Sequence, residues 1–209
     1  MSTMLQTCLF KIFQERRSIR HFDPTFNVTE KEIVELLELA SSAPSAWNLQ
    51  HWKFLVITDS AAKQKLLPIT YGQKQVTEAS VVVAVLGDLQ ANLNAEAVYD
   101  QDTYMPEKVK ADQLAQIKFS YANLPTLPRD EAVRNASLAA MQLMLAAKAK
   151  GLDSGPMGGY DAEQLTETFN IPSRYIPVML IVIGKAAKPA YPSFRLSIAE
   201  KIVWNGFTS

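Results

Sequence analysis

The chain has 209 residues, of which 48% are apolar and 20% charged, and 21 basic side chains balance 21 acidic ones. This composition is typical of a folded globular protein and excludes a disordered or fibrous chain. A neutral chain has no overall field to attract a nucleic-acid backbone. We therefore expect no nucleic-acid partner, and any bound anion requires a local basic cluster.

Two further classes are disfavoured by what the chain contains. The longest purely aliphatic run, Val81–Leu86, is too short to span a bilayer, and the first residues do not follow the pattern of a secretory leader. We expect no membrane association and a cytoplasmic location. The single cysteine, Cys8, excludes an internal disulfide, and His21 and His51 lack the spacing of metal ligands. No metal site is expected.

Hydrophobic periodicity and turn residues divide the chain into helices and strands. The predicted elements are helices over 3–14, 29–42, 60–67, 94–121 (broken near Met105-Pro106), 130–150 and a short one capped by Asp161, with strands over 52–58, 81–86 and 178–183 and a loop over 125–128. Thr29 and Glu32 form a capping-box pattern that marks the start of the second helix. The chain has no internal repeat or linker, so we predict one α+β domain over residues 1–209. Its surplus of helix indicates helices buried in a subunit interface.

A basic cluster follows the first helix. Arg16, Arg17 and Arg20 stand with Ser18 within five residues. Guanidinium groups bind phosphate oxygens in a bidentate way, and a serine hydroxyl can donate one more hydrogen bond. The same cations could instead offset the dipole at a solvated helix end. The pattern alone leaves both interpretations open.

Two loops could contact a flat ligand. Residues 43–52 combine amide side chains with two large aromatics, which can read the edge of a heterocycle, although Pro and Asn also serve as ordinary turn residues. Residues 154–160 contain three glycines, whose backbone N–H groups can approach a planar ligand. They do not form a dinucleotide fingerprint, and no predicted strand leads into them, so a flexible connection is the alternative. Arg195, near the C-terminus, says little alone.

The chain has no Gly-x-Ser-x-Gly elbow and no pair of carboxylates that stands out as acid and base. If it is an enzyme, a bound cofactor is expected to supply the chemistry.

Together, these segments resemble the FMN-dependent nitroreductase family from about Phe13 to Asn205. Each motif is weak alone, but four in this order and at these spacings are specific. The matched residues are Arg16, Ser18, Arg20 and Phe22, then Ala43, Pro44, Ser45, Asn48, Gln50 and Trp52, then Pro156, Gly158, Gly159 and Tyr160, and finally Gly184 and Arg195.

The resemblance implies an α+β fold with a central mixed β-sheet flanked by helices, built as an intertwined homodimer. Two FMN sites would lie at the interface, each using residues from both subunits. Arg16, Arg17, Ser18 and Arg20 would bind the ribityl phosphate and the pyrimidine side of the flavin, with Arg195 on the phosphate. Pro44, Ser45 and Asn48 would come from the partner chain, Gln73 and Gln75 would lie near the polar edge, and Pro156, Gly158 and Gly159 would run along the ring. Many members carry Glu where this chain has Gly158, which leaves the surroundings of the flavin N5 atom open.

The implied activity is hydride transfer from NADH or NADPH through FMN to small electron-poor acceptors such as nitroaromatics or quinones. Donor and acceptor would use one flavin face in turn, which predicts ping-pong kinetics. The same fold also serves dehalogenation, dehydrogenation and flavin breakdown, and a non-catalytic flavin-binding protein is a further alternative. Residues 94–128 are expected to cover the site. Trp47, Tyr71 and Phe119 could stack on substrate or belong to the core.

Overall fold

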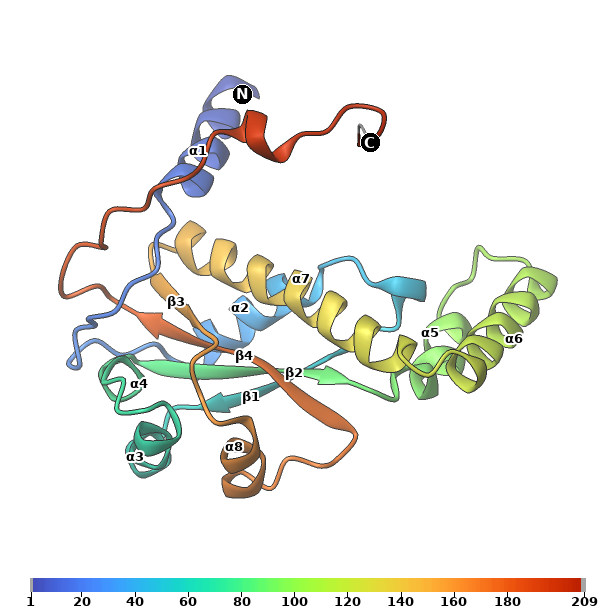
Figure 1. The fold of residues 1–209 in the computed structure, drawn as a ribbon, viewed down its shortest axis with the longest axis horizontal. Coiled ribbons are helices and arrows are strands. Elements are labelled where there is room, and N and C mark those ends of the chain that lie inside the picture. Colours follow the sequence, from blue (N-terminus) through green and yellow to red (C-terminus); the bar gives the residue numbers. More distant parts are fainter. Residues whose placement is uncertain (1, 208–209) are drawn as a thin grey trace.

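The computed structural model describes residues 2–207. Its centre is a four-stranded sheet in the order β1-β2-β4-β3, formed by β1 (Trp52–Ile57), β2 (Val81–Asp88), β3 (Asp153–Met157) and β4 (Tyr175–Gly184). Helices cover both faces (Figure 1), so the predicted α+β class is confirmed. The sheet expected to be mixed is antiparallel in all three of its strand pairings. The side chain of Cys8, placed by the sequence on the first helix, lies outside the described part of the structure.

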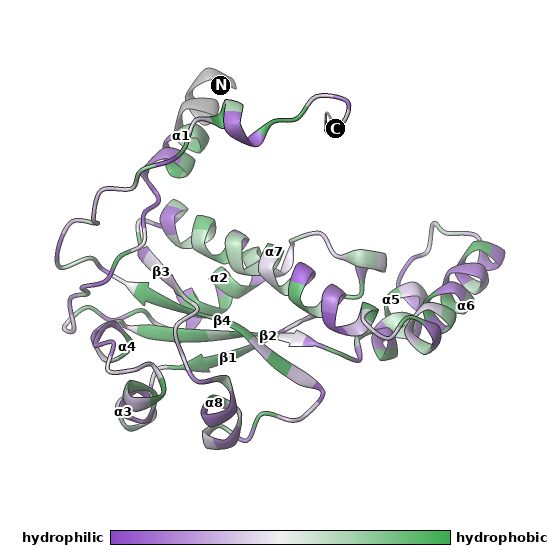
Figure 2. Cartoon of the chain, viewed as in Figure 1, coloured by the Kyte–Doolittle hydropathy of each residue, from purple (hydrophilic) through white to green (hydrophobic). Residues whose placement is uncertain are grey.

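The two middle strands are apolar because both of their faces are covered. Every residue of β2 is buried, and apolar residues concentrate in the sheet (Figure 2). Successive side chains of a strand point to opposite faces. Val81 and Val83 therefore pack in one core cluster, and Val82 and Ala84 pack in the other. A continuous apolar run of this kind is what a strand buried on both faces requires.

One face of the sheet is covered by α2 (Glu30–Ser41) and α7 (Leu127–Ala149). The predicted capping box is present, because the Thr29 hydroxyl accepts from the Glu32 N–H while the Glu32 carboxylate accepts from the Thr29 N–H. The face of α7 against the sheet is rich in alanine, and Ala136, Ala140, Leu143 and Ala147 are fully buried. Small side chains let this long helix lie close to the strands. At Gly87 of β2, a Cβ atom would come within 3.0 Å of Ala132.

The other face is covered by three shorter helices, α3 (Ser60–Ile69), α4 (Gln75–Glu78) and α8 (Ala162–Thr168). Leu66 of α3 and Leu165 of α8 are fully buried in the core cluster on this face. Asp161 caps α8 as predicted, accepting from the Gln164 N–H.

A helical extension lies beyond one end of the sheet (Figure 1). It consists of η2 (Ala91–Asn94), α5 (Ala95–Asp100) and α6 (Glu107–Asn123), with the break near Met105-Pro106 where the sequence predicts it. Its small core joins Tyr99 and Ile117 to Leu49 of the loop before β1. Ile117 is the buried residue of α6, so the rest of this helix is turned largely to solvent.

Both ends of the chain project from the body (Figure 1). They are α1 (Ser2–Glu15) and the C-terminal segment 187–207, which contains η3 (Ile198–Lys201). Both segments carry exposed apolar side chains, among them Phe10 at 65% and Phe194 at 88% accessible. No helix within residues 2–207 is long and apolar enough to cross a membrane.

Two local predictions are wrong. β3 lies in the glycine-rich segment that the sequence places in a loop, because Gly155 and Pro156 have low strand propensity and hide the pattern. α7 begins at Leu127, inside the stretch predicted as a loop. Pro128 is tolerated there because N–H groups in the first turn of a helix make no hydrogen bond within the helix, so the missing N–H of proline costs none.

Gly155 offers a test of how the N-terminal segment packs on the sheet. A Cβ atom at Gly155 would lie 2.5 Å from the Ile19 carbonyl oxygen, whereas one at Gly158 would meet nothing within 4 Å. We expect Gly155→Ala to lower the free energy of unfolding by about 1–3 kcal/mol. The matched variant Gly158→Ala should change it by less than about 0.5 kcal/mol. Urea unfolding of the ligand-free proteins measures both, and equal stabilities would contradict this packing.

Candidate functional site

The predicted basic cluster lines a cavity together with the C-terminal segment. The cavity has a volume of about 290 Å³, and its lining residues are Arg16, Arg17, Ser18, Arg20, Tyr191, Pro192, Ser193 and Arg195. The fold thus brings Arg195 to the three arginines that follow α1. No acidic side chain is among the lining residues, so four guanidinium groups face a common space without a counter-charge. An anionic group is the ligand that this arrangement favours.

Arg16 carries the sharpest indication of a missing partner. Its Nη1 atom is buried and has no hydrogen-bond partner among the residues that the structure describes. A buried donor without an acceptor is unfavourable by about 1–3 kcal/mol, and by more when it is charged. By contrast, Arg17 donates to the carbonyl oxygens of Gln14 and Arg16. The Arg16 side chain therefore fits a bound phosphate or carboxylate.

A second cavity of about 220 Å³ adjoins the first and shares Ser18 and Arg20 with it. Its lining residues are Ser18, Ile19, Arg20, Gln73, Gln75 and residues 155–159. The N-terminal segment reaches this place by pairing with β3, because Ser18 bridges Ser154 and the Ile19 N–H donates to the Ser154 carbonyl oxygen at 3.0 Å. The cavity lined by arginines thus lies next to a pocket of glycine backbone and amide side chains.

The amides of the second cavity are held by hydrogen bonds. Gln73 Nε2 donates to the Gly159 carbonyl oxygen at 2.8 Å, and Gln75 Nε2 contacts Gln73 Oε1 at 3.3 Å. A Cβ atom at Gly159 would lie 3.3 Å from Gln73 Nε2, so a larger residue there would require this side chain to shift. Gly158 has no such neighbour. Its bare backbone faces open space, which a flat ligand can approach closely.

The third predicted segment lies elsewhere. Pro44, Ser45 and Asn48 line neither cavity. Their loop is tied to the first half of α7, where Asn135 Oδ1 accepts from the Ala46 N–H at 2.9 Å. Asn135 is roughly 20 Å along the helix axis from Ala149, the end of α7 that precedes β3. Within one chain, the structure therefore gathers ten of the thirteen predicted residues and separates these three from them.

The loop that carries those three residues has an unusual backbone. Trp47, Asn48 and Gln50 have φ angles of 50°, 54° and 53°. Left-handed backbone is disfavoured for residues with a side chain, especially large ones, and costs on the order of 1–3 kcal/mol for each residue. Such a conformation persists only where the surroundings impose it, and it is common at ligand sites.

His51, which follows this loop, is a notable residue that the sequence leaves without a role. It is fully buried, and its Nε2 atom lies 2.9 Å from the Tyr121 hydroxyl on α6. Burial lowers the pKa of His51 even though the Glu131 and Asp88 carboxylates act to raise it. Burial likewise raises the pKa of Tyr121. Two neutral rings thus join the strained loop to the helical extension. The sequence feature that could have indicated a role for His51 is its position between Gln50 and Trp52 in a predicted binding loop.

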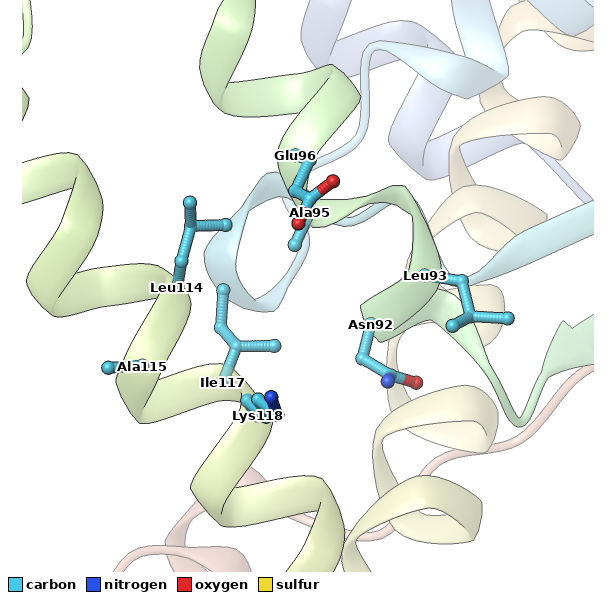
Figure 3. A pocket seen from close by; sticks show the side chains of 8 residues that line it. All are labelled: Asn92, Leu93, Ala95, Glu96, Leu114, Ala115, Ile117 and Lys118. Carbon is cyan, nitrogen blue, oxygen red and sulfur yellow. The ribbon is translucent and has the colours of Figure 1, made fainter.

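The helical extension contains a separate cavity of about 440 Å³, which Figure 3 shows from close by. Leu93 and Glu96 line it on one side, and Leu114, Ile117 and Lys118 line it on the other. None of the predicted site residues borders it. Of the three candidate stacking residues, Trp47 packs against the small core of the extension. Tyr71 and Phe119 are 70% and 64% exposed.

The side chains of the two adjoining cavities are guanidinium, hydroxyl and amide groups, which bind and orient a ligand. Within the described residues, no three His, Cys, Asp or Glu side chains are grouped so as to hold a metal ion. The donor set matches a phosphate joined to a flat heterocycle: charge lies in one cavity, and backbone and amide edges lie in the next.

Comparisons with a family model and with known proteins agree on one protein family. Residues 13–185 match the model of the nitroreductase family. The chain is 48% identical over 196 residues to YodC of Bacillus subtilis (strain 168), provisionally named an NAD(P)H nitroreductase, covering 92% of this chain and 96% of that one. It is 34% identical over 188 residues to a CLA biosynthesis enone reductase of Lactiplantibacillus plantarum, covering 86% of each chain.

A solved structure extends the likeness to the fold. A protein of Exiguobacterium sibiricum 255-15, provisionally named a nitroreductase and crystallised in complex with FMN, superposes with a TM-score of 0.89 at 39% identity. The match covers 94% of this chain and 97% of that one. The structure thus places the chain among the α+β proteins with the nitroreductase fold. With the family match over most of its length, the chain belongs to the nitroreductase family.

The burial of His51 predicts a specific pH dependence of stability. Because its folded-state pKa lies below the ordinary 6.5, the unfolded chain takes up a proton first as the pH falls through that value. Stability should therefore decline below about pH 6.5, by at most about 1.4 kcal/mol per pH unit from this residue. His51→Gln should make the decline shallower.

Urea unfolding at pH 7.5, 6.5 and 5.5 tests this prediction. A decline that is equally steep in His51→Gln would show that other groups cause it.

Proposed function

We propose that this chain is an FMN-dependent oxidoreductase that uses NADH or NADPH to reduce small electron-poor molecules such as nitroaromatics or quinones. One observation carries the proposal: Arg16, whose Nη1 atom is buried and has no partner among the described residues, lines a cavity together with three further arginines. This cavity shares Ser18 and Arg20 with a pocket of glycine backbone and amides. Family membership and the FMN bound to the similar protein of E. sibiricum support the assignment.

The residues divide by chemistry into those that bind charge and those that orient a ring. Arg16, Arg17, Ser18 and Arg195 would hold the phosphate, because they surround the first cavity. Arg20 borders both cavities and would place its positive charge at the pyrimidine side of the flavin. The amides of Gln73 and Gln75 would meet the polar edge, and Pro156, Gly158 and Gly159 would run along the ring.

When bound, FMN would supply the redox chemistry by accepting a hydride at N5 from the nicotinamide and passing it to the acceptor. The chain positions the reactants and sets the charge around them. The guanidinium of Arg20 stabilises negative charge that develops nearby. The open space beside Gly158 leaves room for a flat molecule. If donor and acceptor occupy this one space in turn, the kinetics are ping-pong. The enone reductase among the relatives shows that the family also includes a protein named for another electron-poor substrate.

We further propose that the functional unit is a homodimer whose sites combine both subunits. The separation of Pro44, Ser45 and Asn48 from the two cavities supports this, because a second copy could bring its own loop to the site. Exposed apolar side chains on α1, on the outer face of α7 and along the C-terminal segment supply a surface for it, and they include Leu9, Phe13, Leu138, Met141, Phe194 and Trp204. In this proposal residues 1–209 act as one domain, in the cytoplasm, where NADH and NADPH are available.

Removing one guanidinium tests the cofactor site. Arg20→Ala should weaken FMN binding about tenfold to a hundredfold, since a charge-assisted hydrogen bond is lost from a partly enclosed site. Quenching of FMN fluorescence during titration measures the affinity. Arg129→Ala, which removes an exposed arginine outside both cavities, should leave it unchanged. A wild-type protein that binds no FMN would refute the proposed function, and normal affinity in Arg20→Ala would show that the site is misplaced.

A charge on the outer face of α7 tests the dimer. Met141 is 37% exposed and lines neither cavity. Met141→Glu would place an unpaired carboxylate in the proposed interface, and we expect a monomer that has also lost FMN affinity. Light scattering after gel filtration gives the mass of each variant. Thr168→Glu, on α8 at the opposite face of the sheet, should remain dimeric, and a monomeric wild-type protein would contradict the proposal.

A further inference from the structure

We propose that Asn135 of α7 is a positioning residue for the loop 45–50, and that Glu131 fixes its orientation. The importance of this loop for cofactor binding rests on the proposed function. The way in which α7 holds it rests on the contacts of this structure alone.

The loop needs support from outside itself. Three of its residues, Trp47, Asn48 and Gln50, have left-handed backbone without being glycine. Inside the loop, Ser45 Oγ accepts from the Gln50 N–H at 3.0 Å, and Gln50 Nε2 donates to the Asn48 carbonyl oxygen at 3.1 Å. These bonds join loop residues to one another, so they define a shape without attaching it to the body of the protein.

Within the described part of the chain, two side-chain hydrogen bonds anchor the loop to distant residues, and Asn135 makes the shorter one. Its Oδ1 atom accepts from the Ala46 N–H at 2.9 Å, and Asn94 Nδ2 reaches the Leu49 carbonyl oxygen at 3.4 Å. Asn135 is only 2% exposed, so water does not compete for this bond. This hydrogen bond is therefore stronger than an exposed bond of the same length. Removing the Asn135 side chain would also remove the acceptor of the Ala46 N–H.

Glu131 determines which way the Asn135 amide faces. Asn135 Nδ2 donates to the Glu131 carbonyl oxygen at 2.7 Å and to Glu131 Oε2 at 2.8 Å. Since the nitrogen is engaged by Glu131, the oxygen must point to Ala46. Glu131 is 8% exposed as a whole residue, and its carboxylate is also paired with Arg134 on the same helix. A buried carboxylate thus acts on the loop through one amide.

The placement gives Asn135 a function beyond stabilising α7. A hydrogen bond from a side chain to the carbonyl four residues earlier is common inside helices, and Ser137 makes one to Val133 at 2.7 Å. Ser137 makes no bond to the loop, however, whereas Asn135 joins α7 to the residues proposed to line the partner's flavin. Loss of Asn135 should release the loop while α7 remains formed.

Four variants test the inference: Asn135→Ala, Asn135→Asp, the double variant E131Q/N135D, and the control Ser137→Ala. Amide hydrogen exchange of the segment 45–50 is measured by mass spectrometry on the ligand-free protein, and FMN affinity is measured by fluorescence. We expect Asn135→Ala to speed exchange of the loop and to weaken FMN binding, each about tenfold. Ser137→Ala should stay near wild type. Relative to Asn135→Asp, the double variant should recover part of both properties, because the amide introduced at position 131 can donate to the carboxylate introduced at position 135, whose other oxygen accepts from the Ala46 N–H. The hydrogen bond to the Glu131 backbone carbonyl is absent from both variants.

The outcomes separate this inference from the proposed function. Unchanged loop exchange in Asn135→Ala, or equal acceleration in Ser137→Ala, would overturn it. Faster exchange with unaltered FMN affinity would show that Asn135 holds a loop that does not serve the cofactor, and this also overturns the positioning role. A wild-type protein without FMN affinity would refute the proposed function. The exchange data would then test only whether Asn135 holds the loop in place. If Asn135→Ala does not fold, the comparison of Asn135→Asp with E131Q/N135D decides the same question.

Discussion

The candidate site depends on the close approach of the N-terminal segment to β3. The Ile19 N–H donates to the Ser154 carbonyl oxygen, and the Ile19 carbonyl lies where a side chain at position 155 would stand. This contact joins residues that are distant in sequence. It sets the arginines after α1 beside the glycine backbone after β3. The guanidinium groups therefore lie next to a backbone surface that a flat ligand can approach. Without it, the basic cluster would be an ordinary solvated helix end.

Much of the fold was predictable because its elements obey local rules. The capping box at Thr29, the apolar run of β2 and the alanine-rich face of α7 each follow from a pattern within a few residues. β3 was missed because its strand character comes from its partner β4 and not from its own residues, which include Gly155 and Pro156. The antiparallel order of the sheet also depends on contacts that no local pattern encodes.

The sequence indicated candidate residues but not their geometry. In the structure, the basic cluster, Gln73, Gln75 and the glycines line two adjoining cavities, and Arg195 joins them from the far end of the chain. Pro44, Ser45 and Asn48 do not, which no motif spacing could indicate. Nor could the sequence reveal that Asn135 of α7 accepts from Ala46 of this loop, or that His51, which follows the loop, contacts Tyr121 of α6. Contacts of this kind depend on how the helices pack.

The position of Arg195 links the two ends of the chain. Arg195 stands on the projecting C-terminal segment, whereas the other arginines of the cavity follow α1. An anion bound by all four arginines would therefore hold the C-terminal segment against the body. Its binding free energy would stabilise the ordered position of that segment. A protease would cut the tail more readily when the cavity is empty. In a cell, the survival of intact protein would then follow the supply of its ligand.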